Sequence, residues 1–163
     1  MLHYFLLFFQ CLYSKTEPVN KNVEVLFQDD TDKIVIFSSR NKPNKTLHIL
    51  NSFSKTDGKY KYETGTGEFA KNVDIEGEYE FLKVSKVTNT SNSIVWGAVF
   101  NYEDAEKISY TPLDVNDNIL HQSTIFLTEK NTVADKLPQG IYEKVDEIHY
   151  QVIDSDENVI VEW

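Results

Sequence analysis

Residues 94–100 read Ile-Val-Trp-Gly-Ala-Val-Phe and contain no polar side chain. A continuous apolar run of this length is typical of a strand that is buried on both faces. Gly97 within the run marks a close backbone approach or a bulge, because a strand interior otherwise favours a side chain that packs. We therefore predict a central strand here, with Trp96 in the core.

Upstream of this run, strand patterns alternate with turn-forming segments. The Thr56-Asp57-Gly58 turn precedes an alternating Lys-Tyr-Lys-Tyr strand. A polar, turn-rich loop joins the first two predicted strands, at 23–27 and 34–37. Residues 65–77 hold three of the six glycines and are predicted to form a loop. Between Tyr79 and Val87 the apolar positions change phase twice, which predicts a bulge or bend. The upstream strands are predicted over 23–27, 34–37, 46–53 and 59–62.

Downstream, one hairpin pattern occurs twice with an offset of 40 residues. Its turns read Asp-Val-Asn-Asp-Asn at 114–118 and Asp-Ser-Asp-Glu-Asn at 154–158. Asp and Asn suit turns because their side chains bond nearby backbone groups and tolerate left-handed φ. Both turns resemble the opening of an EF-hand loop, but Ile119 and Val159 stand where that loop needs glycine. We predict structural turns that do not require calcium.

These patterns predict an all-β, antiparallel fold of about nine or ten strands. A meander over roughly 23–64 leads into an Ig-like or β-sandwich-like half over roughly 78–163. We treat 23–163 as one β domain, with 23–77 and 78–163 as its candidate sub-units. Helix-like spacing between Val133 and Ile148 is interrupted by Pro138 and Gly140, so at most a single helical turn is expected near 141–146.

The N-terminus begins with an apolar run, LHYFLLFFQCLY, at residues 2–13. The run is too short to span a bilayer and matches the apolar region of a secretory signal, although no Lys or Arg precedes it. Cys11, near the end of this run, resembles the cysteine of a lipoprotein signal. In such signals a small residue normally precedes the cysteine, whereas here Gln10 precedes it. Lipidation at Cys11, cleavage after Ser14 and a first core strand are the alternatives. We predict a leader or lipoprotein-type anchor at 1–14 and a polar tether at 15–22.

Charge is distributed unevenly along the chain. The net charge is −10, and residues 101–163 carry all of it, whereas residues 33–62 carry +6. A strongly acidic segment repels phosphates and anionic lipid head groups, so we predict no nucleic-acid partner. The acids of the two turns would form one partner-binding cluster if both hairpins ended on the same edge of the fold. That cluster comprises Asp114, Asp117, Asp154, Asp156 and Glu157.

Several of these segments resemble small exported proteins of unknown function from Firmicutes such as Bacillus. The resemblance is carried by Val95–Val99, Ile108–Tyr110, Leu137–Gln139 and the closing hairpin from Ile148 to Ile160. In that family the closing turn reads D-x-D-G-N-V-I, and Glu157 stands here in place of its glycine. The resemblance implies export and a β fold, and it carries no activity.

No sequence motif supports catalysis or a cofactor. Gly65-Thr66-Gly67-Glu68-Phe69-Ala70 matches a relaxed dinucleotide fingerprint, but no buried parallel strand precedes it and no helix follows it. The body histidines His48, His121 and His149 lie outside any zinc motif. His121 and Ser123 share a strand face, and only geometry could make them part of a triad. We predict no metal and no cofactor.

The sequence is compatible with three functions. The first is an exported or surface-tethered, non-enzymatic domain that binds a protein or another component of the cell envelope, with a membrane tether at its N-terminus. The second is an acidic immunity or inhibitor protein that neutralises a basic partner. An enzyme is the third and least supported.

Overall fold

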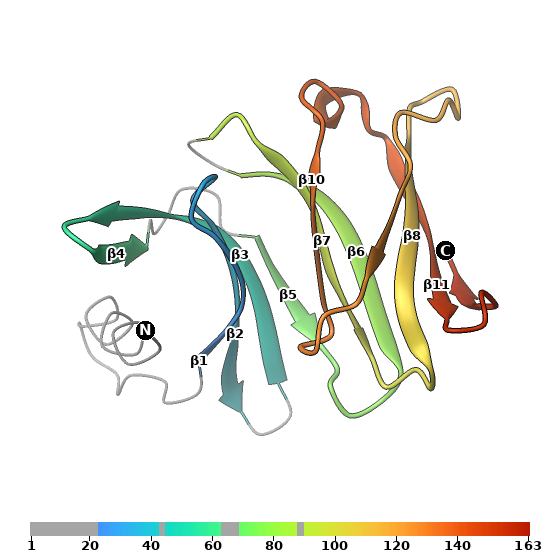
Figure 1. The fold of residues 1–163 in the computed structure, drawn as a ribbon, viewed down its shortest axis with the longest axis horizontal. Helices are drawn as coiled ribbons and strands as arrows, with labels where there is room; N and C mark the ends of the chain where they lie inside the picture. Colours follow the sequence, from blue (N-terminus) through green and yellow to red (C-terminus); the bar gives the residue numbers. More distant parts are fainter. Residues whose placement is uncertain (1–22, 43–44, 63–68, 88–89) are drawn as a thin grey trace. The chain divides into compact units, whose positions relative to one another are not determined.

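The computed structural model describes residues 23–42, 45–62, 69–87 and 90–163 (Figure 1). The expected leader at 1–14, Cys11 and the expected tether at 15–22 lie outside the described residues. The described chain divides into two compact units. The first unit comprises described residues 23–73 with Val87 and Thr90, and the second comprises 74–86 and 91–163. This division falls close to the boundary expected from the sequence, between 77 and 78.

The first unit is an antiparallel sheet in the order β1-β2-β3-β4, with β5 also paired to β3. This is the expected meander with one strand added. Asp29 shapes the first turn because its Oδ1 accepts the backbone N–H groups of Thr31 and Asp32. The strands are β1 (Val23–Asp29), β2 (Ile34–Lys42), β3 (Lys45–Thr56), β4 (Lys59–Tyr62) and β5 (Phe69–Val73).

Strand β5 corrects the prediction of a loop over 65–77. It pairs with the first half of β3, from Leu50 opposite Phe69 to Thr46 opposite Val73, whereas β4 pairs with the second half. The segment has no clear apolar alternation, and its extended form depends on the free edge of a strand about 20 residues earlier. Local sequence patterns do not carry that information.

The second unit is a sandwich of a three-stranded sheet, β10-β7-β6, and a four-stranded sheet, β12-β11-β8-β9. Strands from both sheets contribute to one apolar core, which includes Leu82, Val95, Ile108, Val133 and Val152. Its elements are β6 (Tyr79–Lys86), β7 (Ser93–Phe100), β8 (Ala105–Leu113), β9 (Ser123–Phe126), β10 (Thr132–Leu137), η1 (Tyr142–Lys144), β11 (Glu147–Asp154) and β12 (Val159–Glu162).

The strand order of the second unit is that of an immunoglobulin-like sandwich. If β6, β7 and β8 are taken as strands A, B and C, then β10, β11 and β12 take the places of E, F and G. In a constant-type immunoglobulin domain the fourth strand joins the sheet of A, B and E. Here the fourth strand, β9, pairs with β8 and enlarges the other sheet. The predicted Ig-like half is therefore confirmed.

Strand β7 lies in the centre of its sheet, and Trp96 is only 1% exposed, as predicted. Trp96 packs edge-on against Phe81, and its indole N–H donates to Ser85 Oγ at 2.9 Å. Gly97 is the predicted close approach, because a Cβ built there would lie 2.0 Å from the Phe81 carbonyl oxygen.

Two other predictions need correction. The bulge expected between 79 and 87 is absent from β6, which pairs with β7 without a register shift from Tyr79 to Lys86. Phe81 and Leu82 point to opposite faces and both are buried, so the change of apolar phase reflects burial on both faces. The described residues form twelve strands, which exceeds the nine or ten expected. The single helical turn expected near 141–146 is present as η1.

Candidate functional site

The two Asp-rich turns have the same hydrogen-bond pattern. Asp114 Oδ1 accepts the backbone N–H groups of Asn116 and Asn118, at 2.8 and 3.0 Å. Asp154 Oδ1 accepts the equivalent N–H groups of Asp156 and Asn158, both at 2.8 Å. In each turn the Asn side-chain amide also donates to the Asp carboxylate, which is the main reason that the pKa of each Asp lies below its usual value. These carboxylates hold the turns together.

The fourth residue of each turn has left-handed backbone geometry. Asp117 has a φ of 59° and Glu157 a φ of 67°. Glycine adopts this region without the steric cost that a Cβ brings. The structure thereby explains why a turn of this shape would take glycine at the position that Glu157 occupies.

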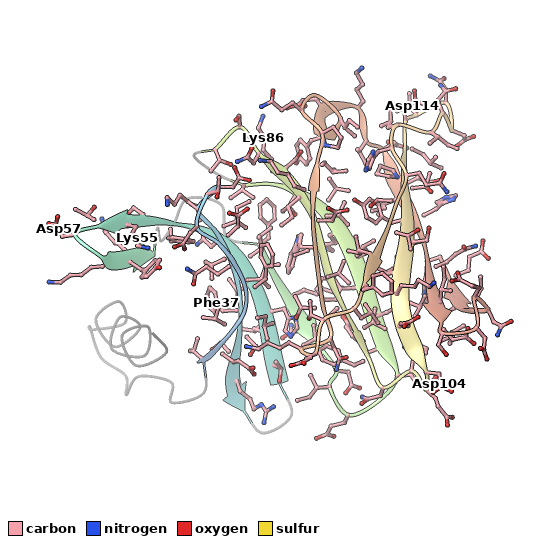
Figure 2. The ribbon with its side chains drawn as sticks, in the orientation of Figure 1. Phe37, Lys55, Asp57, Lys86, Asp104 and Asp114 are labelled. Atoms are coloured by element: carbon pink, nitrogen blue, oxygen red, sulfur yellow. The ribbon has the colours of Figure 1, made fainter. Side chains whose placement is uncertain are left out.

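The structure does not meet the condition under which the five acids would form one cluster, because the two hairpins do not end on the same edge. Strands β8 and β11 are antiparallel, with Leu113 opposite Glu147 and Ala105 opposite Asp154. The turn after β8 and the turn after β11 therefore lie at opposite ends of the sheet, about 25 Å apart for eight strand residues. Figure 2 shows Asp114 at one end of β8 and Asp104 just before the other. Asp114 and Asp117 form one group, and Asp154, Asp156 and Glu157 form another.

Charge also differs between the two units. The second unit contains 18 Asp and Glu against 6 Lys, a net charge of −12. The rest of the chain, residues 1–73 and 87–90, contains 8 acids and 10 bases, a net charge of +2. The negative charge is therefore a property of the whole sandwich and does not depend on a single cluster.

A row of side chains crosses the outer face of the four-stranded sheet, one from each strand. Lys107 on β8 lies opposite Phe126 on β9 and opposite Ile153 on β11, and Ile153 lies opposite Val159 on β12. Phe126 is 70% exposed and Val159 is 48% exposed. We call Phe126, Lys107, Ile153 and Val159 the outer row.

A register shift determines the direction of Val159. Val152 pairs with Val161 but Ile153 pairs with Val159, so Ile160 is an extra residue in β12. Ile160 and Val161 both pack against the core. Without this bulge, alternation from Val161 would turn Val159 inward, whereas the bulge directs it to the outer face.

Lys107 is the single cation of the outer row and is largely covered. Its side chain is 11% exposed, and its Nζ pairs with the Glu157 carboxylate, whose side chain is 72% exposed. The same Nζ lies 5.9 Å from the centroid of the Phe126 ring. The outer row therefore presents aromatic and aliphatic side chains to solvent, beside the Glu157 carboxylate. The positive charge of Lys107 is largely covered and is paired with that carboxylate.

His121 and Ser123, the pair considered for a catalytic triad, both contact other side chains of the second unit. The Ser123 hydroxyl donates to the Asp135 carboxylate at 2.9 Å, and the Tyr110 hydroxyl donates to the same oxygen at 2.7 Å. His121 stacks obliquely near the Tyr110 ring, with centroids 6.1 Å apart. The single proton of Ser123 is thus directed to Asp135 and not to His121, which differs from a Ser-His-Asp triad. Burial, aided by Asp135, raises the pKa of Tyr110.

The other two described histidines, His48 and His149, belong to different units. His149 lies 2.7 Å from Glu147 on the exposed surface of β11. His48 is buried in β3, and desolvation lowers its pKa to about 4. Among the described residues, no group of three or more His, Cys, Asp or Glu side chains could hold a metal ion. Of the glycine-containing motif, 65–68 lie outside the described residues, while Phe69 and Ala70 belong to antiparallel β5.

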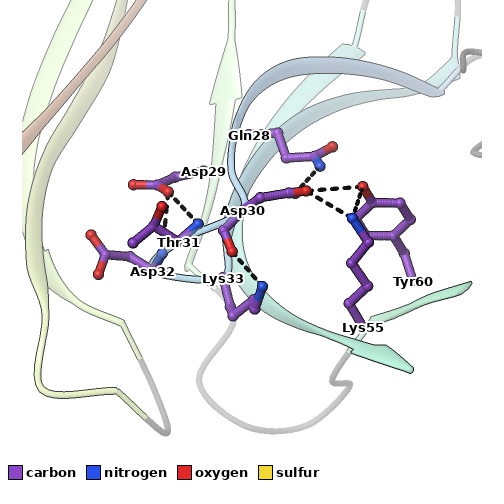
Figure 3. A network of polar contacts seen from close by, with 8 residues as sticks. All are labelled: Gln28, Asp29, Asp30, Thr31, Asp32, Lys33, Lys55 and Tyr60. Atoms are coloured by element: carbon purple, nitrogen blue, oxygen red, sulfur yellow. Dashed lines mark hydrogen bonds and ion pairs between the residues drawn. The ribbon is translucent and has the colours of Figure 1, made fainter. Parts of the chain in front are cut away.

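The first unit contains an exposed polar network that sequence analysis did not single out (Figure 3). Asp30, in the β1–β2 turn, accepts hydrogen bonds from Lys55 at 3.0 Å and Tyr60 at 3.1 Å, and also from Gln28. The Gln28 and Lys55 hydrogen bonds lower the pKa of Asp30, and the contacts with Tyr60 and Asp30 raise that of Lys55. The network joins the turn to the β3–β4 hairpin, which indicates a structural role.

Comparison with known proteins identifies no relative, because no family model, curated protein or solved structure matches this chain. None of the helical segments in the described residues has the length and apolarity to cross a bilayer.

Proposed function

We propose that this protein is an exported or surface-tethered, non-enzymatic module that binds a basic protein, or another basic component of the cell envelope, through its second unit. The net charge of −12 on that Ig-like sandwich carries the proposal. Sandwiches of this kind present broad faces and loop clusters that serve recognition in many unrelated proteins. Export rests on the apolar N-terminal run and the family resemblance.

The charge predicts how the partner associates. A surface of one sign raises the association rate with an oppositely charged partner roughly 10- to 1000-fold in favourable cases. Salt removes this advantage, because the Debye length falls from about 10 Å at 0.1 M to about 3 Å at 1 M. Association should therefore slow steeply as salt rises, while dissociation changes less.

The same charge also favours a second function, an immunity or inhibitor protein that neutralises a basic partner. Cellular location distinguishes the two functions. An immunity protein against a toxin that acts in the cytosol would remain inside the cell, whereas the proposed module would fractionate with the envelope or the medium.

The test is affinity capture from the native cell envelope, followed by kinetics with the captured partner. A variant with Asp117→Asn and Asp156→Asn removes two exposed charges from the second unit without removing the carboxylates that hold the turns. A matched variant with Glu24→Gln and Asp57→Asn removes two from the first unit. We expect slower association at low salt for the first variant only, with the difference lost at 1 M. A partner whose association rate ignores salt, or whose contact surface is itself acidic, would refute the proposal.

A further inference from the structure

The outer row has the properties of the apolar centre of a protein interface. It runs across all four strands of one sheet face, and its aromatic member, Phe126, is 70% exposed. Interface hot spots are enriched in aromatic residues and surrounded by polar positions that exclude water. Single exposed apolar residues are ordinary. Here, however, register aligns two exposed apolar residues, Phe126 and Val159, and the half-buried Ile153 around one covered cation, and a bulge directs Val159 to the same face.

The surroundings of the row determine which partner it suits. Glu157 pairs with Lys107 at the row, and Asp154 and Asp156 precede it in the same turn. Asp104 and Glu106 lie beside the row at the start of β8, where Ala105 pairs with Asp154. Apart from Lys107, whose charge is already paired, these neighbours are acidic. A surface docking here would need cationic groups around an apolar contact.

The charge also argues against a second copy of the chain as the occupant. A symmetric contact through this face would bring together two sandwiches that each carry −12. Like charges opposite one another cost several kcal/mol and suppress the wrong partner. The same repulsion applies to anionic lipid and to nucleic acid.

We infer that the outer row is the docking site for a protein surface that places an aromatic or aliphatic side chain within a ring of Lys or Arg. The inference rests on the proposed function and locates its contact. The apolar side chain packs beside Phe126, Ile153 and Val159, and the surrounding cations pair with Glu157 and its acidic neighbours. Glu157 then exchanges part of its contact with Lys107 for the partner's cation.

Three nine-residue peptides test the inference on the full-length chain. One alternates Lys with Trp, one alternates Lys with Ser, and one alternates Glu with Trp. Amide chemical shifts in ¹⁵N-labelled protein report both the affinity and the place of binding. We expect the Lys-Trp peptide to shift the amides of the outer row and to bind about tenfold more tightly than the Lys-Ser peptide, as one aromatic contact of about 1.4 kcal/mol would produce. The Glu-Trp peptide should not bind.

Two variants make the test specific. Phe126→Ser should reduce the Lys-Trp affinity to that of the Lys-Ser peptide. Val115→Ser removes another exposed apolar side chain of the same unit, 74% exposed in the turn after β8, and should leave the affinity unchanged.

The outcomes separate the inference from the proposed function. If both Lys peptides bind with equal affinity and shift amides over the whole acidic surface, the inference fails and the proposed function stands. If neither Lys peptide binds at low salt, the proposed function fails with it. Binding of the Glu-Trp peptide, or shifts of the outer-row amides on concentrating the protein alone, would overturn the inferred partner class.

Discussion

Replacing Gly97 with alanine is expected to destabilise the second unit strongly, because the new methyl group has no space. An ideal Cβ at this position lies 2.0 Å from the Phe81 carbonyl oxygen, 2.9 Å from Leu82 Cδ1 and 3.1 Å from Leu82 Cα. Carbon–oxygen contacts between neighbouring strands are normally about 3.3 Å or longer. The strands β6 and β7 must therefore separate or twist by about 1 Å.

This clash cannot be relieved by a rotamer change, since the closest atom belongs to the backbone. Overpacking commonly costs about 1–3 kcal/mol, and disturbing the adjacent ladder hydrogen bonds adds about 1 kcal/mol each. We expect Gly97→Ala to lower the free energy of unfolding by about 3 kcal/mol or more. Urea titration followed by the fluorescence of the buried Trp96 measures this loss directly.

Gly140→Ala is the matched control in the same unit. No atom lies within 4 Å of a Cβ at Gly140, but its φ of 78° is left-handed, so an alanine there should cost about 1 kcal/mol. If Gly97→Ala costs no more than Gly140→Ala, the close approach of β6 and β7 does not exist as described.

Four further changes test separate parts of the structure. Trp96→Ala should cost about 3–5 kcal/mol, whereas Trp163→Ala, at a residue that is 64% exposed, should cost less than about 0.5 kcal/mol in urea unfolding. The folded-state pKa of His48, about 4, lies below its unfolded value of about 6.5, so the unfolded chain binds more protons between these pH values. Stability should therefore fall by about 2–3 kcal/mol from pH 6.5 to 4 and stay level with respect to His48 above pH 6.5, and His48→Leu should remove that part of the slope in urea titrations at several pH values. Asp117→Gly should raise the free energy of unfolding by about 0.5–1 kcal/mol because φ is 59° there, while Asp117→Ala should lower it. The melting temperature should be the same within about 2 °C in millimolar Ca²⁺ and in EDTA, and a larger rise with Ca²⁺ that Asp154→Ala abolishes would make that turn a calcium site.

Local patterns in the sequence were sufficient for most of the strands, for the Asp-rich turns and for the central core residue Trp96. The apolar run at 94–100 indicated a central strand, and both Asp-rich turns have the geometry that their side chains favour. These features depend on a residue and its near neighbours, through side-chain alternation, backbone preference and short-range hydrogen bonds. The charge imbalance is likewise a property of the sequence.

The candidate binding surface depended on long-range pairing, which only the tertiary structure decided. The five acids would form one cluster only if both hairpins ended on the same edge, and the antiparallel pairing of β8 with β11 places their turns at opposite ends. The outer row joins residues that are up to about 50 positions apart in the sequence, and the bulge at Ile160 reverses the direction that alternation assigns to Val159. Strand β5 was missed for the same reason, because it extends along the free edge of β3. In each case a short segment is compatible with several partners and registers, and the packing of the whole unit selects one of them.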